Sequence, residues 1–394
     1  MGAVGQAQHR SRAPRWCRWT GLALLLCGSG AGAADVWKPG LSLTAEERYD
    51  DDVLLRSEGG EGGQLMTKLS PQISLQGNSR TWEVNGAYAA DLFMRHGSGR
   101  NTVDHRLDLG AKRRLSNRLN LRGEGRLWYV SDPTSLPRMG MARSLVPVLY
   151  GIADLGVGWS ASQRWLLSLD YRFEGARIEE PGREPGFLHQ GTAQALYRLN
   201  RRTDAGIDAR IQRFEFGPQG ALAAGPAALL RHRFTRTMTL SLGAGASYYR
   251  EDSGAVEGWV PRATAALDGT VRRFTWGVAA GHDLVGASGF ATALTADFAA
   301  ATVGWHVVRN VQVRAMGNLF GNAPAPDFGP GSFSRADLAS QGYAVAAAAE
   351  WQVQKAWALQ LQFTRIGQVG AVGVATPDLT RNIAALRAVF TPWD

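Results

Sequence analysis

The stretch WLLSLDYRFEGARIE, residues 165–179, shows the pattern that decides the fold of this chain. Apolar side chains occupy every second position, at Leu167, Leu169, Tyr171 and Phe173. Polar side chains occupy the positions between them, at Ser168, Asp170, Arg172 and Glu174. Successive side chains of a β-strand point to opposite faces, so this alternation predicts a strand with one apolar and one hydrated face.

The same alternation recurs along the chain from Leu41 onward, and residues 119–130 and 357–366 are two further clear cases. We predict roughly eighteen strands from this period. They lie near residues 40–49, 65–76, 82–96, 103–115, 119–130, 146–159, 165–179, 187–199, 203–216, 226–234, 238–250, 259–267, 270–284, 291–306, 311–320, 340–353, 356–366 and 380–390. Their mean length of about twelve residues exceeds that of soluble strands and suits a tilted strand that crosses a bilayer.

The connections between these segments alternate in length. Short turns are expected at 77–80, 116–118, 160–164, 200–202, 235–237, 268–269, 307–310 and 354–355. Longer loops rich in Gly, Pro and acids are expected at 50–64, 131–145, 180–186, 217–225, 251–258 and 321–339. This asymmetry is typical of an outer-membrane barrel with short periplasmic turns, longer extracellular loops and both termini in the periplasm.

The predicted fold class is therefore all-β, a transmembrane antiparallel up-and-down β-barrel of about 18 strands. A soluble β-sandwich or β-propeller is the alternative, since both also use alternating strands. The apolar faces here mix Ala, Gly, Leu, Val, Tyr and Trp rather than large aliphatic residues, which favours a lipid-facing wall. No repeat of propeller-blade length is visible, and hairpins are the repeating unit.

The first 34 residues have the composition of a secretory signal peptide. Four arginines precede an uncharged run from Gly21 to Ala34, and Ala31-Gly32-Ala33 forms a cleavage site of the A-x-A type. We therefore predict that residues 1–34 are removed and that 35–394 form a single barrel domain. Removal of the four arginines lowers the formal charge from +9 to about +5. Both cysteines, Cys17 and Cys27, lie in the removed part, which excludes disulfides and Cys-based metal sites in the mature chain.

Aromatic residues gather near the predicted strand ends, as in the interfacial girdles of barrels. They are Trp82, Trp128, Tyr129, Trp159, Trp165, Trp259, Trp305, Trp351 and Trp357. The last segment, 381–390, alternates and ends in Phe390, which resembles the terminal strand that barrel-assembly machinery recognises. The chain departs from that pattern because residues 391–394 follow, so Phe390 or Trp393 is the candidate assembly signal.

The sequence contains no motif for catalysis or cofactor binding. The histidines beyond the signal segment are isolated, and the adjacent pair His282-Asp283 should point to opposite faces of a strand. The glycine clusters at 59–63 and 243–245 lack the context of a phosphate loop. Asp50, Asp51 and Asp52 with Glu58 and Glu61 form an acidic loop that could hold Ca²⁺, although a solvated loop is the simpler interpretation. We predict no enzyme, no cofactor, no metal and no nucleic-acid partner.

The hydrated face carries charges of both signs. By parity, we expect the following residues to face the lumen: Glu83, Asp91, Arg95, Asp104, Arg106, Asp108, Arg122, Glu124, Arg126, Asp170, Arg172, Glu174, Asp208, Arg210, Arg314, Gln360 and Gln362. A barrel of this size can enclose water, and alternating signs hydrate a pore without strong charge selectivity. The alternative is that these residues form salt bridges that brace and partly close the barrel. The loop 321–339 could fold inward as a constriction or cap the outside.

Three features carry a family resemblance: the segment LSLTAEERYDDD at 41–52, the proline within SPQISL at 70–75, and the hairpin series. With these, the mature chain resembles Gram-negative outer-membrane β-barrel proteins of the porin-like kind over its whole length. More loosely, it looks like the barrels that accompany exopolysaccharide export systems. The resemblance implies an outer-membrane location and contact with outer-membrane lipid and with barrel-assembly machinery. We expect no separate plug domain, because the first predicted strand, near 40–49, begins soon after the predicted cleavage site.

The functional expectation is an outer-membrane channel that takes part in export of an exopolysaccharide, together with periplasmic polysaccharide-export proteins. A sugar polymer could slide along hydrogen-bonding groups of the lumen without one tight site. The alternatives are a general diffusion porin for small hydrophilic solutes and a closed structural or adhesive barrel.

Overall fold

The computed structural model describes residues 36–51, 63–97, 101–131, 147–179, 184–254, 256–286, 293–324, 340–369 and 379–392. Its strands are β1 (Val36–Asp50), β2 (Gln64–Asn78), β3 (Trp82–Arg95), β4 (Thr102–Arg114), β5 (Leu119–Val130), β6 (Val148–Ser160), β7 (Trp165–Ile178), β8 (Gly186–Arg198), β9 (Thr203–Phe216), β10 (Gln219–Arg233), β11 (Met238–Glu251), β12 (Glu257–Val271), β13 (Phe274–Gly286), β14 (Ala293–Val308), β15 (Val311–Pro324), β16 (Ser340–Gln354), β17 (Trp357–Val369) and β18 (Leu379–Phe390). The predicted signal peptide, residues 1–34, lies outside the described residues and stays a prediction.

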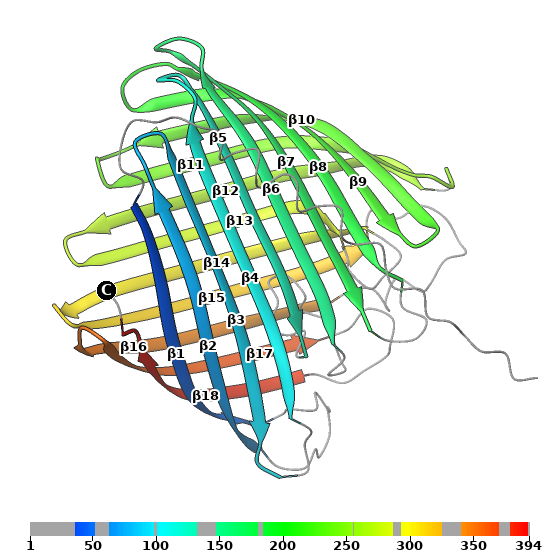
Figure 1. Ribbon diagram of the computed structural model, residues 1–394. Helices are drawn as coiled ribbons and strands as arrows, with labels where there is room; N and C mark the ends of the chain where they lie inside the picture. Colours follow the sequence, from blue (N-terminus) through cyan, green and yellow to red (C-terminus); the bar gives the residue numbers. More distant parts are fainter. Residues whose placement is uncertain are drawn as a thin grey trace, which may run out of the picture.

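Each strand pairs antiparallel with the next one in the sequence, and β1 also pairs with β18, so that the 18-stranded sheet closes on itself (Figure 1). The predicted class, an all-β antiparallel up-and-down barrel, is confirmed. The strands have 12 to 16 residues each, long enough to cross a bilayer at a tilt. Among the described residues, no helix is long and apolar enough to span a membrane.

One predicted loop is wrong. The Gly- and Pro-containing segment 217–225 was expected to be a long connection, but β10 begins at Gln219 and only Gly217 and Pro218 join it to β9. Gly217 has a φ of 56°, the left-handed conformation that a two-residue hairpin favours. Gly225 lies inside β10, where a β-carbon would overlap the carbonyl oxygen of Ala246. A run of small residues here permits close approach of two strands and does not end one.

Two other boundaries also differ from the prediction. The turn expected at Asp268-Gly269 lies instead at Arg272 and Arg273, because β12 continues to Val271. Gly269 makes room for the Trp276 ring, since a β-carbon at position 269 would lie only 2.6 Å from it. The first four residues of the expected loop 321–339 belong to β15, and 325–339 lie outside the described residues. The two alternatives for that loop, a constriction of the lumen and a cap on the outside, therefore both stay predictions.

Packed apolar side chains fill part of the interior toward the end of the barrel that carries the longer connections. One cluster comprises Leu188, Phe214, Phe216, Ala221, Ala223, Tyr249, Val260, Leu284 and Ala293. A second comprises Val130, Val148, Tyr150, Ile152 and Ala176. The first joins strands that are not neighbours in the sheet, since β8 and β13 come into contact. The wall between β8 and β13 is thus folded back on itself, and apolar side chains fill this fold.

The opposite face of the sheet carries large exposed apolar side chains. Leu169, Ile207 and Leu361 are 60–63% exposed, and such side chains occur on every part of the wall. Trp82, Trp159, Trp165, Trp259, Trp305, Trp351 and Trp357 share this outer face. Trp128 does not: its indole nitrogen donates to Asp108 at 3.3 Å on the inner face. Its assignment to the girdle was wrong because it sits one position out of phase with Tyr129.

Candidate functional site

The strand register places the predicted lumen residues on the face opposite the exposed apolar side chains. Asp170 and Arg172, for example, flank the outward Tyr171, and Arg210 precedes the outward Ile211. Most of these charges form an ion pair, with a partner on the same strand, on a neighbouring strand or across the interior. The inner face is therefore a set of ion-pair clusters rather than a row of free charges.

The densest cluster surrounds Asp91 on β3, which is only 4% exposed. Lys68 approaches it to 3.1 Å and Arg106 to 2.9 Å, while the Ser70 hydroxyl donates to the same carboxylate. A buried carboxylate needs such partners because burial of an unpaired charge is costly. Two cations on one acid leave the cluster with a net positive charge.

A second cluster lies on β4 to β7. Arg122 contacts Asp170 at 2.5 Å, and Arg126 lies 3.8 Å from Asp108. In the same region Arg172 contacts Glu174 at 3.2 Å, and Tyr150 donates to Glu174 at 2.9 Å. These pairs are partly exposed to the interior, so each contributes little to stability and both signs stay accessible to a solute.

A third group of contacts spans the folded part of the wall. Arg210 on β9 contacts Asp283 on β13 at 2.6 Å, and Arg262 on β12 pairs with Asp208 on β9. Gln212 donates toward the carbonyl oxygen of Leu284 at 3.5 Å. Because none of these strand pairs is adjacent in the sheet, the contacts act as struts that hold the two walls together.

The other predicted residues lie apart from these clusters. Arg314 donates to Gln312 at 2.7 Å, and Gln362 donates to Thr364 at 3.2 Å. Gln360 accepts from Arg387 at 3.2 Å, and Asp104 accepts from the backbone of Ser131 at 2.9 Å. In the register, Glu83 lies opposite Lys112, Arg95 opposite Met66 and Glu124 opposite Asp154.

The sequence analysis missed several inner residues that the clusters require. They are Glu46, Lys68, Arg262, Asp283 and Arg387. The same two-residue period, extended through 40–49, 65–76 and 380–390, would have found Glu46, Lys68 and Arg387. No local signal shows that Asp283 meets a residue 73 positions away.

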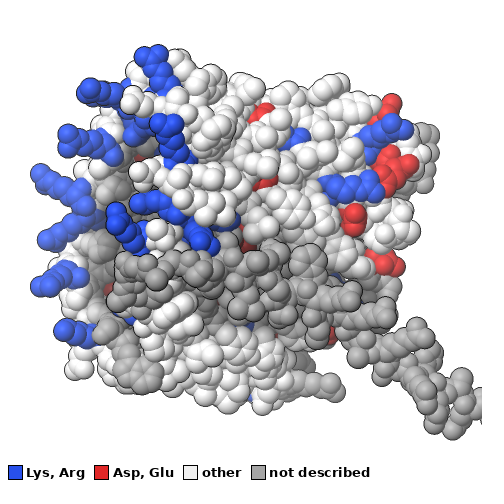
Figure 2. Space-filling model, turned by 45° about the horizontal axis from the view of Figure 1, so that its top comes forward, with Lys and Arg blue, Asp and Glu red and all other residues white. Residues whose placement is uncertain are grey.

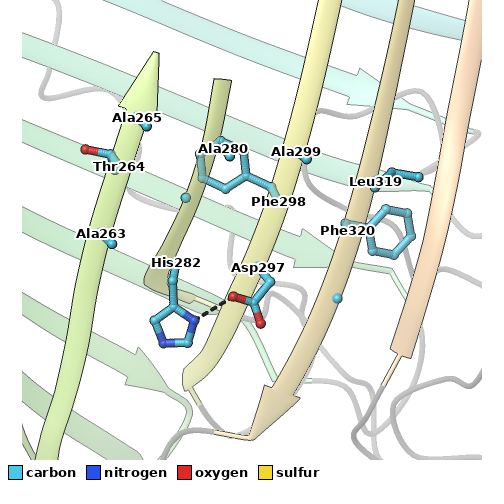
Figure 3. A pocket seen from close by; sticks show the side chains of 12 residues that line it. Ala263, Thr264, Ala265, Ala280, His282, Asp297, Phe298, Ala299, Leu319 and Phe320 are labelled. Atoms are coloured by element: carbon cyan, nitrogen blue, oxygen red, sulfur yellow. Dashed lines mark hydrogen bonds and ion pairs between the residues drawn. The ribbon is translucent and has the colours of Figure 1, made fainter. Parts of the chain in front are cut away.

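His282 and Asp283 point to opposite faces, as the strand period requires. Asp283 is part of the struts, whereas His282 shares a hydrogen bond of 2.7 Å with Asp297 (Figure 3). His282 and Asp297 lie at one end of a cavity of about 490 Å³ along β12 to β15. Its lining residues are mostly Ala, Gly, Leu and Phe, and Thr264 contributes a hydroxyl group.

The described residues contain no group of three or more His, Cys, Asp or Glu side chains placed to hold a metal ion. Of the acidic loop that could have bound Ca²⁺, Asp52, Glu58 and Glu61 lie outside the described residues. The Asp50 carboxylate is bound by Arg381 at 2.6 Å, and Asp51 accepts from Asn382. These two carboxylates tie β1 to β18 instead.

Outside the membrane-crossing part, Asp252 follows β11 and binds Arg213 of β9 through two hydrogen bonds of 2.6 Å each. The guanidinium lowers the pKa of the Asp252 carboxyl. A lowered pKa means that the contact stabilises the fold fully above the ordinary carboxyl pKa and is lost as the pH falls through the lowered value. We expect an NMR titration to show a depressed pKa for Asp252 that returns to normal in Arg213→Gln. An unchanged pKa in that variant would refute this assignment.

The closed sheet, the apolar exterior and the polar interior define the class of this protein: a transmembrane β-barrel, built for an outer membrane. Strands satisfy their backbone hydrogen bonds only by closing into a barrel, and an apolar belt needs lipid around it. The predicted location in the outer membrane of a Gram-negative bacterium is the one that this architecture fits.

No family model and no curated protein matches the sequence. Similar solved structures include OccK2 (OpdF) of Pseudomonas aeruginosa, with 11% identity, a TM-score of 0.47, and coverage of 91% of this chain and 99% of that one. The outer membrane protein opdK from the same organism has 11% identity, a TM-score of 0.46, and coverage of 90% and 99%. Acinetobacter baumannii OccAB2 has 9% identity, a TM-score of 0.44, and coverage of 90% and 98%. No functional residue is transferred from them at this level of similarity.

Proposed function

We propose that the barrel is a passive outer-membrane channel for small hydrophilic solutes. The observation that carries this proposal is the inner face itself, where ion pairs and amides line β1 to β7 and β15 to β18. Polar side chains of both signs hydrate a passage and offer hydrogen bonds without one tight site. The struts between β9 and β13 narrow the interior, which favours small solutes over a polymer chain.

Export of an exopolysaccharide, which the sequence resemblance suggested, gains no support from any described residue. Solute uptake and polysaccharide secretion, measured together, distinguish a diffusion channel from an exporter. Purified protein in liposomes should swell them in solutions of small sugars, with rates that fall as sugar size rises. Deletion of the gene should reduce uptake of such solutes and leave the secreted polysaccharide unchanged. Loss of polysaccharide with normal uptake would refute the diffusion channel, and absence of swelling would indicate a closed barrel.

The Asp91 cluster predicts the ion selectivity of the channel. Asp91→Asn leaves Lys68 and Arg106 without their shared acid and makes the interior more positive. A unit charge acts on an ion about 4 Å away in water with roughly 1 kcal/mol. We therefore expect the chloride-over-potassium permeability ratio, measured from the reversal potential, to rise about two- to fivefold.

Asp297→Asn is the matched control, because it removes the same charge from a side chain that is 72% exposed on the outer face. Its selectivity should equal that of the wild type. An equal shift in both variants would mean that the Asp91 cluster does not line the conducting path.

A further inference from the structure

The short turns at one end of the barrel carry a one-sided charge. The eight turns between β2 and β3, β4 and β5, and so on to β16 and β17 all lie within the described residues. Each contains at least one basic side chain, and none contains Asp or Glu. We call these side chains the basic turn ring: Arg80, Arg118, Arg164, Arg201, Arg202, Arg236, Arg272, Arg273, Arg309 and Lys355.

The ring is exposed, and none of its side chains forms an ion pair with a carboxylate of the described residues. All ten side chains belong to exposed residues. Arg164 donates to the Tyr197 hydroxyl at 2.9 Å and Arg273 to the carbonyl oxygen of Val307 at 3.4 Å, both neutral acceptors. The nearby Asp204 is engaged by two strand residues, Arg198 and Arg233.

The position of the ring follows the whole rim of the barrel. In Figure 2 the blue side chains form a fringe along the end that Figure 1 shows with the short turns, while blue and red mix at the other end. A protein partner that docks on one side would need a single patch. One or two cations on every hairpin instead suit a ligand that surrounds the barrel.

Aromatic side chains on the outer face lie next to the ring. Trp165 directly follows Arg164, Phe274 directly follows Arg273, and Trp357 lies two residues after Lys355. Phe274 pairs in register with Trp305, and the Trp357 and Phe390 rings lie 4.6 Å apart. Amphipathic aromatic rings mark the boundary between the acyl chains and the headgroups. The basic turn ring therefore lies at the level of the headgroups of the periplasm-facing phospholipid leaflet.

From the charge of the ring and its place beside the aromatic belt, we propose that it binds the phosphate headgroups of anionic phospholipids in that leaflet. Arg side chains extend along the interface and hold phosphates through charge-assisted hydrogen bonds. This interaction anchors the barrel at its periplasmic rim. It concerns the exterior, so it would hold even if the channel were closed.

The test compares thermal unfolding in phosphatidylcholine vesicles with and without phosphatidylglycerol. Wild-type protein should unfold at a higher temperature when phosphatidylglycerol is present. The triple variant Arg118→Gln, Arg236→Gln and Arg309→Gln removes three of the ten cations and should lose about a third of that increase, whereas the corresponding Arg→Lys variant should retain it. The amount of phosphatidylglycerol that copurifies after detergent extraction should fall in parallel.

The matched control is a triple Arg→Gln variant at Arg177, Arg250 and Arg365, exposed residues near the other end of the barrel. It should keep the phosphatidylglycerol effect. An equal loss in both triple variants would overturn the proposal, because any positive charge would then suffice. A turn variant with an unchanged lipid response would also overturn it, and a changed ion selectivity in that variant would show that the ring acts on solutes instead.

Discussion

Replacement of Arg381 by Met is expected to lower the free energy of unfolding by about 3–5 kcal/mol, because it leaves a buried carboxylate without its cation. Asp50 is 0% and Arg381 1% exposed. The guanidinium contacts the carboxylate at 2.6 and 3.0 Å across the seam where β1 meets β18. The substitution therefore weakens the pairing of β1 with β18, which closes the barrel.

Urea unfolding of the protein refolded into detergent micelles, followed by Trp fluorescence, measures this loss. Arg314→Met is the control, since that side chain is exposed and donates only to Gln312 in the described contacts. A double variant, Asp50→Leu with Arg381→Met, should regain much of the stability, because a matched apolar pair has no charge to leave unpaired. If Arg381→Met unfolds like the wild type, the ion pair does not secure the seam.

Phe214→Ala is expected to cost about 3–5 kcal/mol of unfolding free energy and to raise the single-channel conductance. Phe214 is 0% exposed, and its ring stacks on Phe216 with centroids 6.4 Å apart. It lies in the cluster with Leu188 and Leu284 that packs β8 and β9 against β13, the two sides of the folded wall. Loss of the phenyl group leaves a cavity between β9 and β13, the strands that the Arg210–Asp283 ion pair joins. The two strands can then move apart and widen the path for ions.

Planar-bilayer recordings give the conductance, and the same urea unfolding gives the stability. Phe214→Leu should preserve most of both values because it keeps most of the apolar volume. Ile211→Ala changes a residue of the same strand that is 52% exposed on the outer face, and its conductance should stay at the wild-type value. A Phe214→Ala protein that is less stable but conducts normally would show that the folded wall does not limit the pore.

The ion pairs across the interior show why the sequence predicted which residues face inward but not which of them are in contact. Parity assigned Arg210 and Asp208 to the inner face. It could not show that Arg210 meets Asp283 or that Arg262 meets Asp208, since alternation fixes only the face on which a side chain lies. Which inner residues touch depends on how the sheet curves. The folded wall includes the run of small residues around Gly225, which the sequence pattern predicted to be a loop.

Apart from the ends of β10, β12 and β15, the sequence by itself determined the strands, their antiparallel order, the outer and inner faces, and the divergence of His282 and Asp283, because a period of two is a local property of an extended backbone. Only the tertiary structure decided the seam between Asp50 and Arg381, the folded wall around Phe214, and the continuous basic turn ring. These features join residues far apart in the chain. Their proximity depends on closure and curvature of the whole sheet, which no local pattern encodes.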